Sequence, residues 1–275
     1  GEEVNAILEG VLADLEAEGD QLEGLLIDLG AADWRRATPA VGWDIATTIA
    51  HLTWTDEVAV KAAVDKAAWD AVVLEAIADP EGFVDAMAFK VAALDSVLLL
   101  ERWRAARPIL AQVLREVPEG EKLPWFGPPM SPTSMATARF METWAHGLDI
   151  ADSLGVVLEP TDRIKHVCHL GVRTRNYSFV SRELATPDED FHVVLTSPSG
   201  QSWTWGPTNA AQRVSGPAQD FAMLVTQRVH RADTDLVAIG ADAEKWLEIA
   251  QAFAGPPGAG RQPGANRQQE GAVDE

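Results

Sequence analysis

The sequence has a single cysteine, Cys168, so it cannot form an internal disulfide. A lone thiol fits the reducing cytoplasm, where we expect the protein to reside. No run of about 18 apolar residues occurs, which argues against a transmembrane helix. The first residues lack the basic, apolar and small-residue segments of a signal peptide. Because the chain begins with Gly1 and not with methionine, the sequence does not exclude a segment before Gly1.

Basic residues are also scarce, with 22 Lys and Arg against 42 Asp and Glu and a net charge of −20. Phosphate backbones and anionic lipid surfaces repel such a chain, so nucleic acid and membrane are poor candidates as partners. Residues 1–160 hold 28 acidic and 11 basic residues, a balance of −17, whereas residues 161–275 hold 14 and 11, a balance of −3. This shift predicts two domains that meet near residue 160.

The first domain is predicted to be helical. Apolar residues at 3-and-4 spacing indicate a helix over residues 4–29, and Asp44 is a predicted N-cap for a helical stretch that reaches residue 78. Further helices are predicted over 81–116, yielding before Pro108, and from Ser134 to Leu154, after a Pro/Gly-rich loop at 118–133. The connections predict an up-and-down four-helix bundle.

The second domain mixes patterns, so the overall fold class is α+β. The sequence predicts helix over 161–183, a hairpin of residues 192–196 and 202–205, a helix from Gly216-Pro217 to Arg228, a strand over 236–240 and a helix over 243–253. From Gly255 onward Gly, Pro, Gln and Arg dominate, which is typical of disorder. The predicted domains are therefore 1–158 and 159–254, with a disordered tail over 255–275.

One pair of residues has a helical ligand spacing. Glu142 and His146 are four residues apart, so both project from one helix face, and Asp149 follows three residues later. His51 lies on an earlier helix, and polar groups on different helices of a bundle can converge on one metal. Two imidazoles and a carboxylate suit a catalytic zinc, and they also accept nickel or iron. By spacing alone, a Glu-x-x-x-His pair is more often a surface pair or a half-buried contact.

The segment Gly42-Trp43-Asp44-Ile45-Ala46-Thr47-Thr48-Ile49-Ala50-His51-Leu52 resembles the Gly-Trp and Ala-His-Leu signature of the DinB-like bundle. More narrowly, it resembles the mycothiol-dependent maleylpyruvate isomerase family. The resemblance implies that His51, Glu142 and His146 bind a divalent metal, commonly zinc. It also implies a small C-terminal α+β domain similar to a sterol-carrier-protein fold, in which Arg228 contacts a substrate carboxylate, the alternative being a surface charge.

Two further motifs, Leu123-Pro124-Trp125-Phe126-Gly127-Pro128-Pro129-Met130-Ser131 and Glu142-Thr143-Trp144-Ala145-His146-Gly147, resemble an actinobacterial subgroup of uncharacterised metal-binding proteins. A wyosine-base-formation label has been attached to this subgroup. The sequence has no iron–sulfur cysteine cluster and no basic RNA-binding face, so we discount that label here. Because the subgroup has loop motifs of its own, its metal site can match that of the isomerase while its substrate differs.

Other candidate residues have plainer explanations. Trp125, Phe126 and Met130 could either roof a pocket or pin the loop to the helices. His166 and His169 flank Cys168, but on a helix position 168 points away from the other two, so a metal site there is disfavoured.

The resemblance leads to one functional hypothesis and two alternatives. The hypothesis is a metal-dependent enzyme, monomeric or homodimeric, that uses a low-molecular-weight thiol, mycothiol, for thiol transfer to a small electrophilic substrate or for its cis–trans isomerisation. Arg228 would orient a substrate carboxylate, and residues 118–133 would close over the site. The alternatives are a metal-dependent hydrolase or isomerase that needs no thiol, and a non-catalytic metal-binding module.

Overall fold

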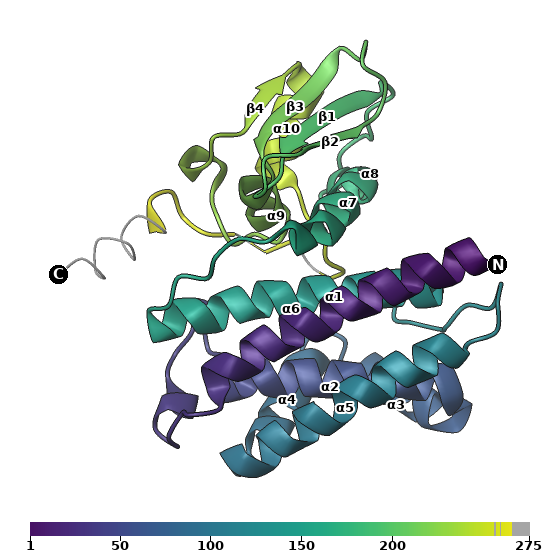
Figure 1. Cartoon of the computed structure of the whole chain (residues 1–275), viewed down its shortest axis with the longest axis vertical. Helices are drawn as coiled ribbons and strands as arrows, with labels where there is room; N and C mark the ends of the chain where they lie inside the picture. The colour runs from purple at the N-terminus through teal and green to yellow at the C-terminus, as the bar shows by residue number, and fades with distance from the viewer. Residues whose placement is uncertain (256, 259, 266–275) are drawn as a thin grey trace. The chain divides into compact units, whose positions relative to one another are not determined.

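The computed structural model describes residues 1–255, 257–258 and 260–265 (Figure 1). A helix-rich N-terminal part is followed by a small sheet with its own helices, which confirms the predicted α+β class. The chain divides into two compact units, Gly1–Val157 and Leu158–Glu275, called here the helical unit and the C-terminal unit. Within the described residues, no helix is long and apolar enough to cross a membrane. Most of the predicted disordered tail, at 256, 259 and 266–275, lies outside the described residues.

Four long helices account for most of the helical unit. Helix α1 packs beside α6, while α2 contacts both α5 and α6 (Figure 1). Their faces meet in an apolar interior in which Leu52, Leu99, Trp103 and Ile150 are almost fully buried. The helices are α1 (Glu2–Leu26), α2 (Ile45–Val64), α3 (Lys66–Ala78), α4 (Phe83–Ala92), α5 (Ser96–Glu116) and α6 (Pro132–Leu154), with a short 3-10 turn, η1, at Asp33–Arg35.

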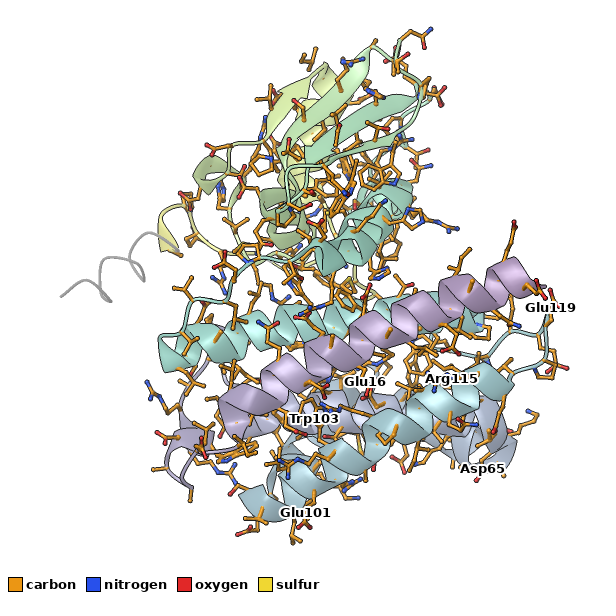
Figure 2. All side chains as sticks on the ribbon, viewed as in Figure 1. Glu16, Asp65, Glu101, Trp103, Arg115 and Glu119 are labelled. Carbon is orange, nitrogen blue, oxygen red and sulfur yellow. The ribbon has the colours of Figure 1, made fainter. Side chains whose placement is uncertain are left out.

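Two predicted helical stretches are each divided in the structure. The stretch from Ile45 to residue 78 breaks at Asp65, which ends α2 and caps α3 by accepting a hydrogen bond from the Ala68 amide at 3.1 Å (Figure 2). The stretch over 81–116 breaks after Ala92, and Asp95 caps the next helix through the Val97 amide at 2.9 Å. Aspartate competes with the helical backbone for hydrogen bonds, and this local effect overrides a continuous helix-favouring composition.

The prediction that the helix ends before Pro108 is wrong, because α5 continues to Glu116. Pro108 lies on the exposed side of α5, whereas Trp103, Ala106 and Leu110 are buried on the other side (Figure 2 labels Trp103). A proline removes one helical hydrogen bond and costs about 3 kcal/mol relative to alanine in a helix interior. Burial of the apolar face on both sides of Pro108 offsets that cost.

The C-terminal unit is built on a four-stranded mixed sheet in the order β2-β1-β3-β4. Strand β1 (Phe191–Thr196) is antiparallel to β2 (Ser202–Trp205), which confirms the predicted hairpin, and parallel to β3 (Gln212–Pro217). Strand β4 (Val237–Ile239) is antiparallel to β3. The helical elements are η2 (Asp162–Ile164), α7 (Lys165–Arg173), α8 (Arg175–Val180), α9 (Ala218–Val225), η3 (Arg231–Asp233) and α10 (Ala241–Ile249).

Strand β3 was not predicted. The helix that follows it, α9, is shorter than the predicted helix. Pro217 ends β3 and precedes α9 as its N-cap, so the helix begins at Ala218 and not at Gly216. Helix α9 ends at Val225, since Gln227 adopts a left-handed φ of 59° and the Arg228 amide donates back to the Met223 carbonyl at 2.7 Å. Arg228 therefore lies beyond the helix that was predicted to end with it.

The N-cap of α2 gives a test of how local sequence positions this helix. Asp44 Oδ1 accepts hydrogen bonds from the Thr47 amide at 2.7 Å and from Thr47 Oγ1 at 2.8 Å. Replacing a capping aspartate by alanine costs about 1–2 kcal/mol. We expect Asp44→Ala to lower the free energy of unfolding, measured in urea, by that amount. Asp44→Asn should keep most of the wild-type stability, because asparagine also caps helices well. Equal stability of Asp44→Ala and the wild type would contradict this role of the cap.

Candidate metal centre

His51 is presented by the second turn of α2, whose start is defined by Gly42, Trp43 and Asp44. Gly42 has a φ of 84°, a left-handed conformation that glycine adopts at little cost. Thr38 Oγ1 donates to the Trp43 carbonyl at 2.8 Å and holds this turn closed. Because the turn and the Asp44 cap fix where α2 begins, they also fix the direction in which His51 projects.

Glu142 and His146 are presented by α6. This helix begins after Ser131, whose hydroxyl accepts from the Ser134 amide at 3.1 Å, and Pro132 occupies its first turn. The two residues are one helical turn apart and lie on the same face, as their spacing predicted.

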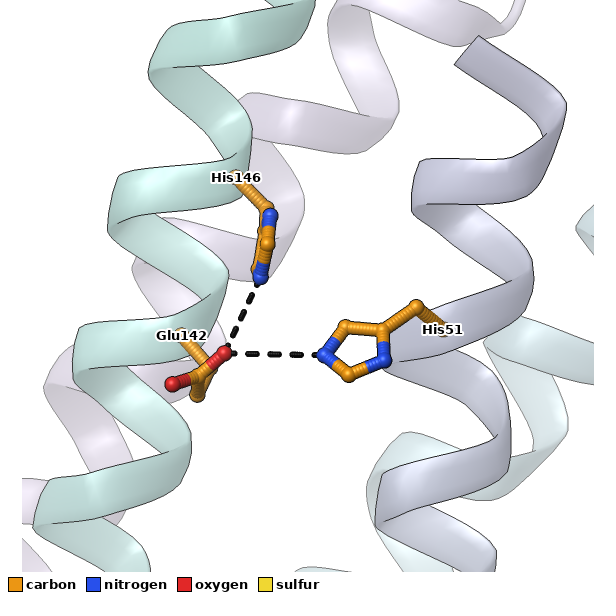
Figure 3. Close-up of side chains that lie close together, drawn as sticks. All are labelled: His51, Glu142 and His146. Atoms are coloured by element: carbon orange, nitrogen blue, oxygen red, sulfur yellow. Dashed lines mark hydrogen bonds and ion pairs between the residues drawn. The ribbon is translucent and has the colours of Figure 1, made fainter. Parts of the chain in front are cut away.

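The structure brings the three predicted residues together (Figure 3). Glu142 Oε2 lies 3.0 Å from His146 Nε2 and 3.6 Å from His51 Nε2. The three potential ligand atoms all lie within 4.8 Å of one another, and within the described part of the chain this is the one group of three or more His, Cys, Asp or Glu residues so arranged. Figure 3 shows both imidazoles directed toward the same carboxylate oxygen from opposite helices. These distances suit three ligands around one ion.

Trp43 forms one wall of this group. Its ring stacks on the His146 ring at a centroid distance of 5.9 Å and lies 5.0 Å from the His51 ring. The Trp43 indole N–H donates to Asp85 Oδ1 of α4 at 3.2 Å, which anchors the wall to a second helix. The ligand-type side chains are partly accessible, with 11% of His51, 13% of His146 and 23% of Glu142 exposed. The group is therefore shielded on one side but not sealed.

The two histidines are oriented by different means. His146 Nδ1 lies 3.5 Å from Asp149 Oδ2, the arrangement in which a carboxylate orients a metal-binding histidine. His51 Nδ1 is buried and has no hydrogen-bond partner among the described residues. Its ring is instead held by packing against Trp43 and by its edge contact with the His146 ring, at a centroid distance of 4.9 Å.

Burial and pairing leave His51 and Glu142 in the protonation states that a metal requires. Burial lowers the pKa of His51 to about 4, although the adjacent Glu142 acts in the opposite direction. Burial raises the pKa of Glu142, but hydrogen bonds from His146 and His51 outweigh it and hold this pKa well below its ordinary value. At neutral pH, His51 is therefore a neutral imidazole and Glu142 a carboxylate, which are the forms that bind a divalent cation. The residues present fit such an ion.

The other candidate residues have surroundings of their own. Arg228 belongs to the C-terminal unit, where its Nη1 donates to the Thr226 carbonyl at 2.6 Å. Trp125 stacks on Trp69 of α3 at 5.7 Å, and Phe126 contacts the same ring at 5.0 Å, so these two loop residues pin the loop to the helices. Met130 pairs with Leu123 through two backbone hydrogen bonds of 2.7 and 2.9 Å.

Within the described part of the chain, the side chains of the His-x-Cys-His segment do not converge as metal ligands would. Cys168 is buried, burial raises the pKa of its thiol, and its Sγ lies 3.5 Å from the Ala218 carbonyl. His169 accepts a hydrogen bond from the Trp205 indole at 3.2 Å.

Sequence reasoning missed two residues near the centre, Trp43 as its wall and Arg139 beside it. Trp43 stood in the signature segment, yet nothing in its spacing predicted contact with both histidines. Arg139 falls in the apolar stripe of α6 between Ala136 and Thr143, and that position was a signal that its charge is buried.

The three residues lie in a part of the chain that matches a known family. The family model described as "Mycothiol maleylpyruvate isomerase N-terminal domain" matches residues 15–151, a range that contains His51, Glu142 and His146. The chain belongs to this family. A second family model, described as "Wyosine base formation", matches residues 187–238.

Similar proteins have been found by sequence and by structure. Uncharacterised proteins of two Mycobacterium tuberculosis strains, CDC 1551 / Oshkosh and ATCC 25618 / H37Rv, are each 54% identical over 250 residues, covering 91% of this chain and 97% of theirs. The crystal structure of a mycothiol-dependent maleylpyruvate isomerase is similar with a TM-score of 0.58 at 15% identity, over 84% of this chain and 92% of that one. A histidine-to-alanine mutant of that isomerase gives 0.56 at 15% identity, over 80% and 89%. At this identity the structural likeness concerns the fold alone.

The lowered pKa of His51 predicts a pH dependence of stability in the metal-free protein. The folded-state pKa of about 4 lies below the ordinary 6.5, so between these values the unfolded chain binds the extra proton. Stability should therefore fall as the pH falls from 6.5 toward 4, by about 2–3 kcal/mol at pH 4.5. Urea unfolding of chelator-treated protein at pH 7 and 4.5 measures this loss. We expect His51→Gln to lose correspondingly less, and an identical loss in both proteins would refute the assignment.

Proposed function

We propose that this chain is a metal-dependent enzyme that uses a low-molecular-weight thiol, mycothiol, for thiol transfer to a small electrophilic substrate or for its cis–trans isomerisation. The observation that carries the proposal is the convergence of His51, Glu142 and His146 on one point, in a chain that belongs to the mycothiol maleylpyruvate isomerase family. Family membership supports the thiol and the reaction class, and the geometry supports the metal.

The donor set suits zinc as the metal, with nickel or iron as alternatives. A divalent ion held by these residues would favour the thiolate form of a thiol ligand, which is the nucleophilic form. His51 and His146 would each offer Nε2, and Glu142 would offer Oε2 and neutralise part of the positive charge. Three protein ligands leave room for an exogenous thiol, whereas structural zinc sites normally have four. Trp43 would keep water away from one side of the bound thiol.

We further propose that Arg228 binds a carboxylate of the substrate. A guanidinium can hold a carboxylate through two parallel hydrogen bonds, which fixes orientation as well as position. The Arg228 Nη1 bond to the Thr226 carbonyl holds one end of this side chain in place.

We do not extend the wyosine description to this chain. A net charge of −20 opposes contact with a phosphate backbone, and one cysteine cannot provide the thiolates of an iron–sulfur cluster.

The metal site is tested by metal content. We expect protein purified without chelators to contain about one equivalent of divalent metal, as a site with three protein ligands would hold, measured by plasma mass spectrometry. His51→Ala and His146→Ala should each lose most of it, because either change removes one of three ligands. His169→Ala is the matched control, since this exposed histidine is not part of the group of three, and it should keep the metal. Wild-type protein without metal, or unchanged content in both ligand variants, would refute the site.

The thiol is tested separately on the cobalt-substituted protein. We expect titration with mycothiol to produce a sulfur-to-cobalt charge-transfer band in the near ultraviolet, because the thiolate would bind the metal directly. S-methyl mycothiol, which lacks the free thiol, should produce no such band. A protein that holds cobalt but does not respond to mycothiol would refute thiol use and would leave the metal site standing, which favours the thiol-independent alternative.

A further inference from the structure

A buried ion pair lies beside the proposed metal centre and is not part of it. Arg139 of α6 and Asp56 of α2 are 4% and 7% exposed, and Arg139 Nε donates to Asp56 Oδ1 at 2.8 Å. Arg139 Nη2 also donates to Thr55 Oγ1 at 2.6 Å. Thr55 Oγ1 in turn donates to the backbone carbonyl of His51 at 2.8 Å. A chain of hydrogen bonds therefore runs from α6 to the backbone of a proposed metal ligand.

The pair lies about one helical turn from the centre on both helices. Arg139 precedes Glu142 by three residues and His146 by seven, so all three project from one face of α6. On α2, Thr55 lies four residues after His51, and Asp56 lies five residues after it. Thr143 Oγ1 donates to the Arg139 carbonyl at 2.9 Å within the same stretch of α6. Helices α2 and α6 thus meet at two successive levels, the three metal-type ligands and the ion pair.

A gain in the free energy of unfolding does not explain well why two charged residues occupy these buried positions. Removing two charges from water costs about as much as their attraction returns, so an apolar pair of similar volume is often equally stable. A shift in the register of α2 against α6 would instead separate the charges and leave both buried without partners, which is strongly unfavourable. The apolar cluster to which both helices contribute includes the small side chains of Ala59 on α2 and Ala136 on α6, and small side chains discriminate weakly between registers.

We propose that Arg139 and Asp56 are positioning residues that fix the register of α2 against α6, so that His51 Nε2 meets Glu142 and His146. Thr55 transmits this constraint to the backbone of His51. The inference rests on the proposed metal site, and it adds a requirement for that site which none of the three ligands supplies.

The test compares two double variants in which an ion pair is replaced by apolar residues. Arg139→Met with Asp56→Leu removes the buried pair. Arg102→Met with Glu57→Leu is the matched control, because this pair also ties α2 to another helix, through contacts of 2.9 and 2.7 Å, but is more exposed. For each protein, zinc affinity is measured by chelator competition, the cobalt d–d spectrum records ligand geometry, and thermal unfolding is followed without metal.

We expect the buried-pair variant to unfold near the wild-type temperature when metal-free, yet to bind zinc at least tenfold more weakly and to show altered cobalt bands. The control variant should match the wild type in affinity and spectrum. Unchanged affinity and bands in the buried-pair variant would overturn the positioning role while the metal site stood. A wild type that binds no metal would overturn both proposals, and one that binds metal without responding to mycothiol would overturn the thiol chemistry alone.

A second pair of variants covers the case in which the double variant does not fold. Thr55→Val keeps the shape of the side chain but removes the hydroxyl that links Arg139 to His51. We expect it to weaken zinc binding several-fold, and Thr55→Ser, which retains the hydroxyl, to restore most of the affinity. Equal affinities for the valine and serine variants would overturn the role assigned to Thr55 and, with it, the proposed route to His51.

Discussion

The contact between α2 and α6 is the constraint on which the candidate site depends. Polar groups from two helices must meet at one point in an otherwise apolar interior, and burying any of them without its partner would be unfavourable. Asp44 and Ser131 define where the two helices begin, and Arg139 and Asp56 pair across the interface. The two caps fix the direction in which side chains project from each helix, and the ion pair fixes the position of one helix along the other. Together they bring Glu142 within reach of both imidazoles.

The charge states of His51 and Glu142 suit the binding of a cation. Burial keeps His51 neutral, and the two histidines keep Glu142 ionised, which are the charge states in which an imidazole and a carboxylate bind a cation at neutral pH. Because His51 lacks a hydrogen-bond partner at Nδ1 among the described residues, its orientation rests on packing against Trp43 and the His146 ring and on the contact of Nε2 with Glu142. The glycine–tryptophan motif therefore contributes a wall as well as a turn.

Local patterns predicted those parts of the fold that depend on local chemistry. The Asp44 cap, the helix carrying Glu142 and His146, and the hairpin of β1 and β2 are readable because each follows from spacing or capping over a few residues. Strand β3 was missed because its polar residues surround a single valine, Val214, and its parallel partner β1 lies some twenty residues earlier. The path of α5 through Pro108 depends on packing, which no local rule contains. The pairing of Arg139 with Asp56 spans 83 residues and has no local signature.

The first and second ligands of the proposed centre are separated by a long stretch of chain, since His51 lies on α2 and Glu142 on the last helix of the helical unit. An ion bound to both would connect parts of the helical unit that are about ninety residues apart in the sequence, and by binding the folded chain it would stabilise that state. The sequence contains one cysteine and no internal disulfide. In this chain a metal would thus act as a reversible cross-link of the folded helical unit. Loss of the ion would lower the stability of that unit as well as disable the site.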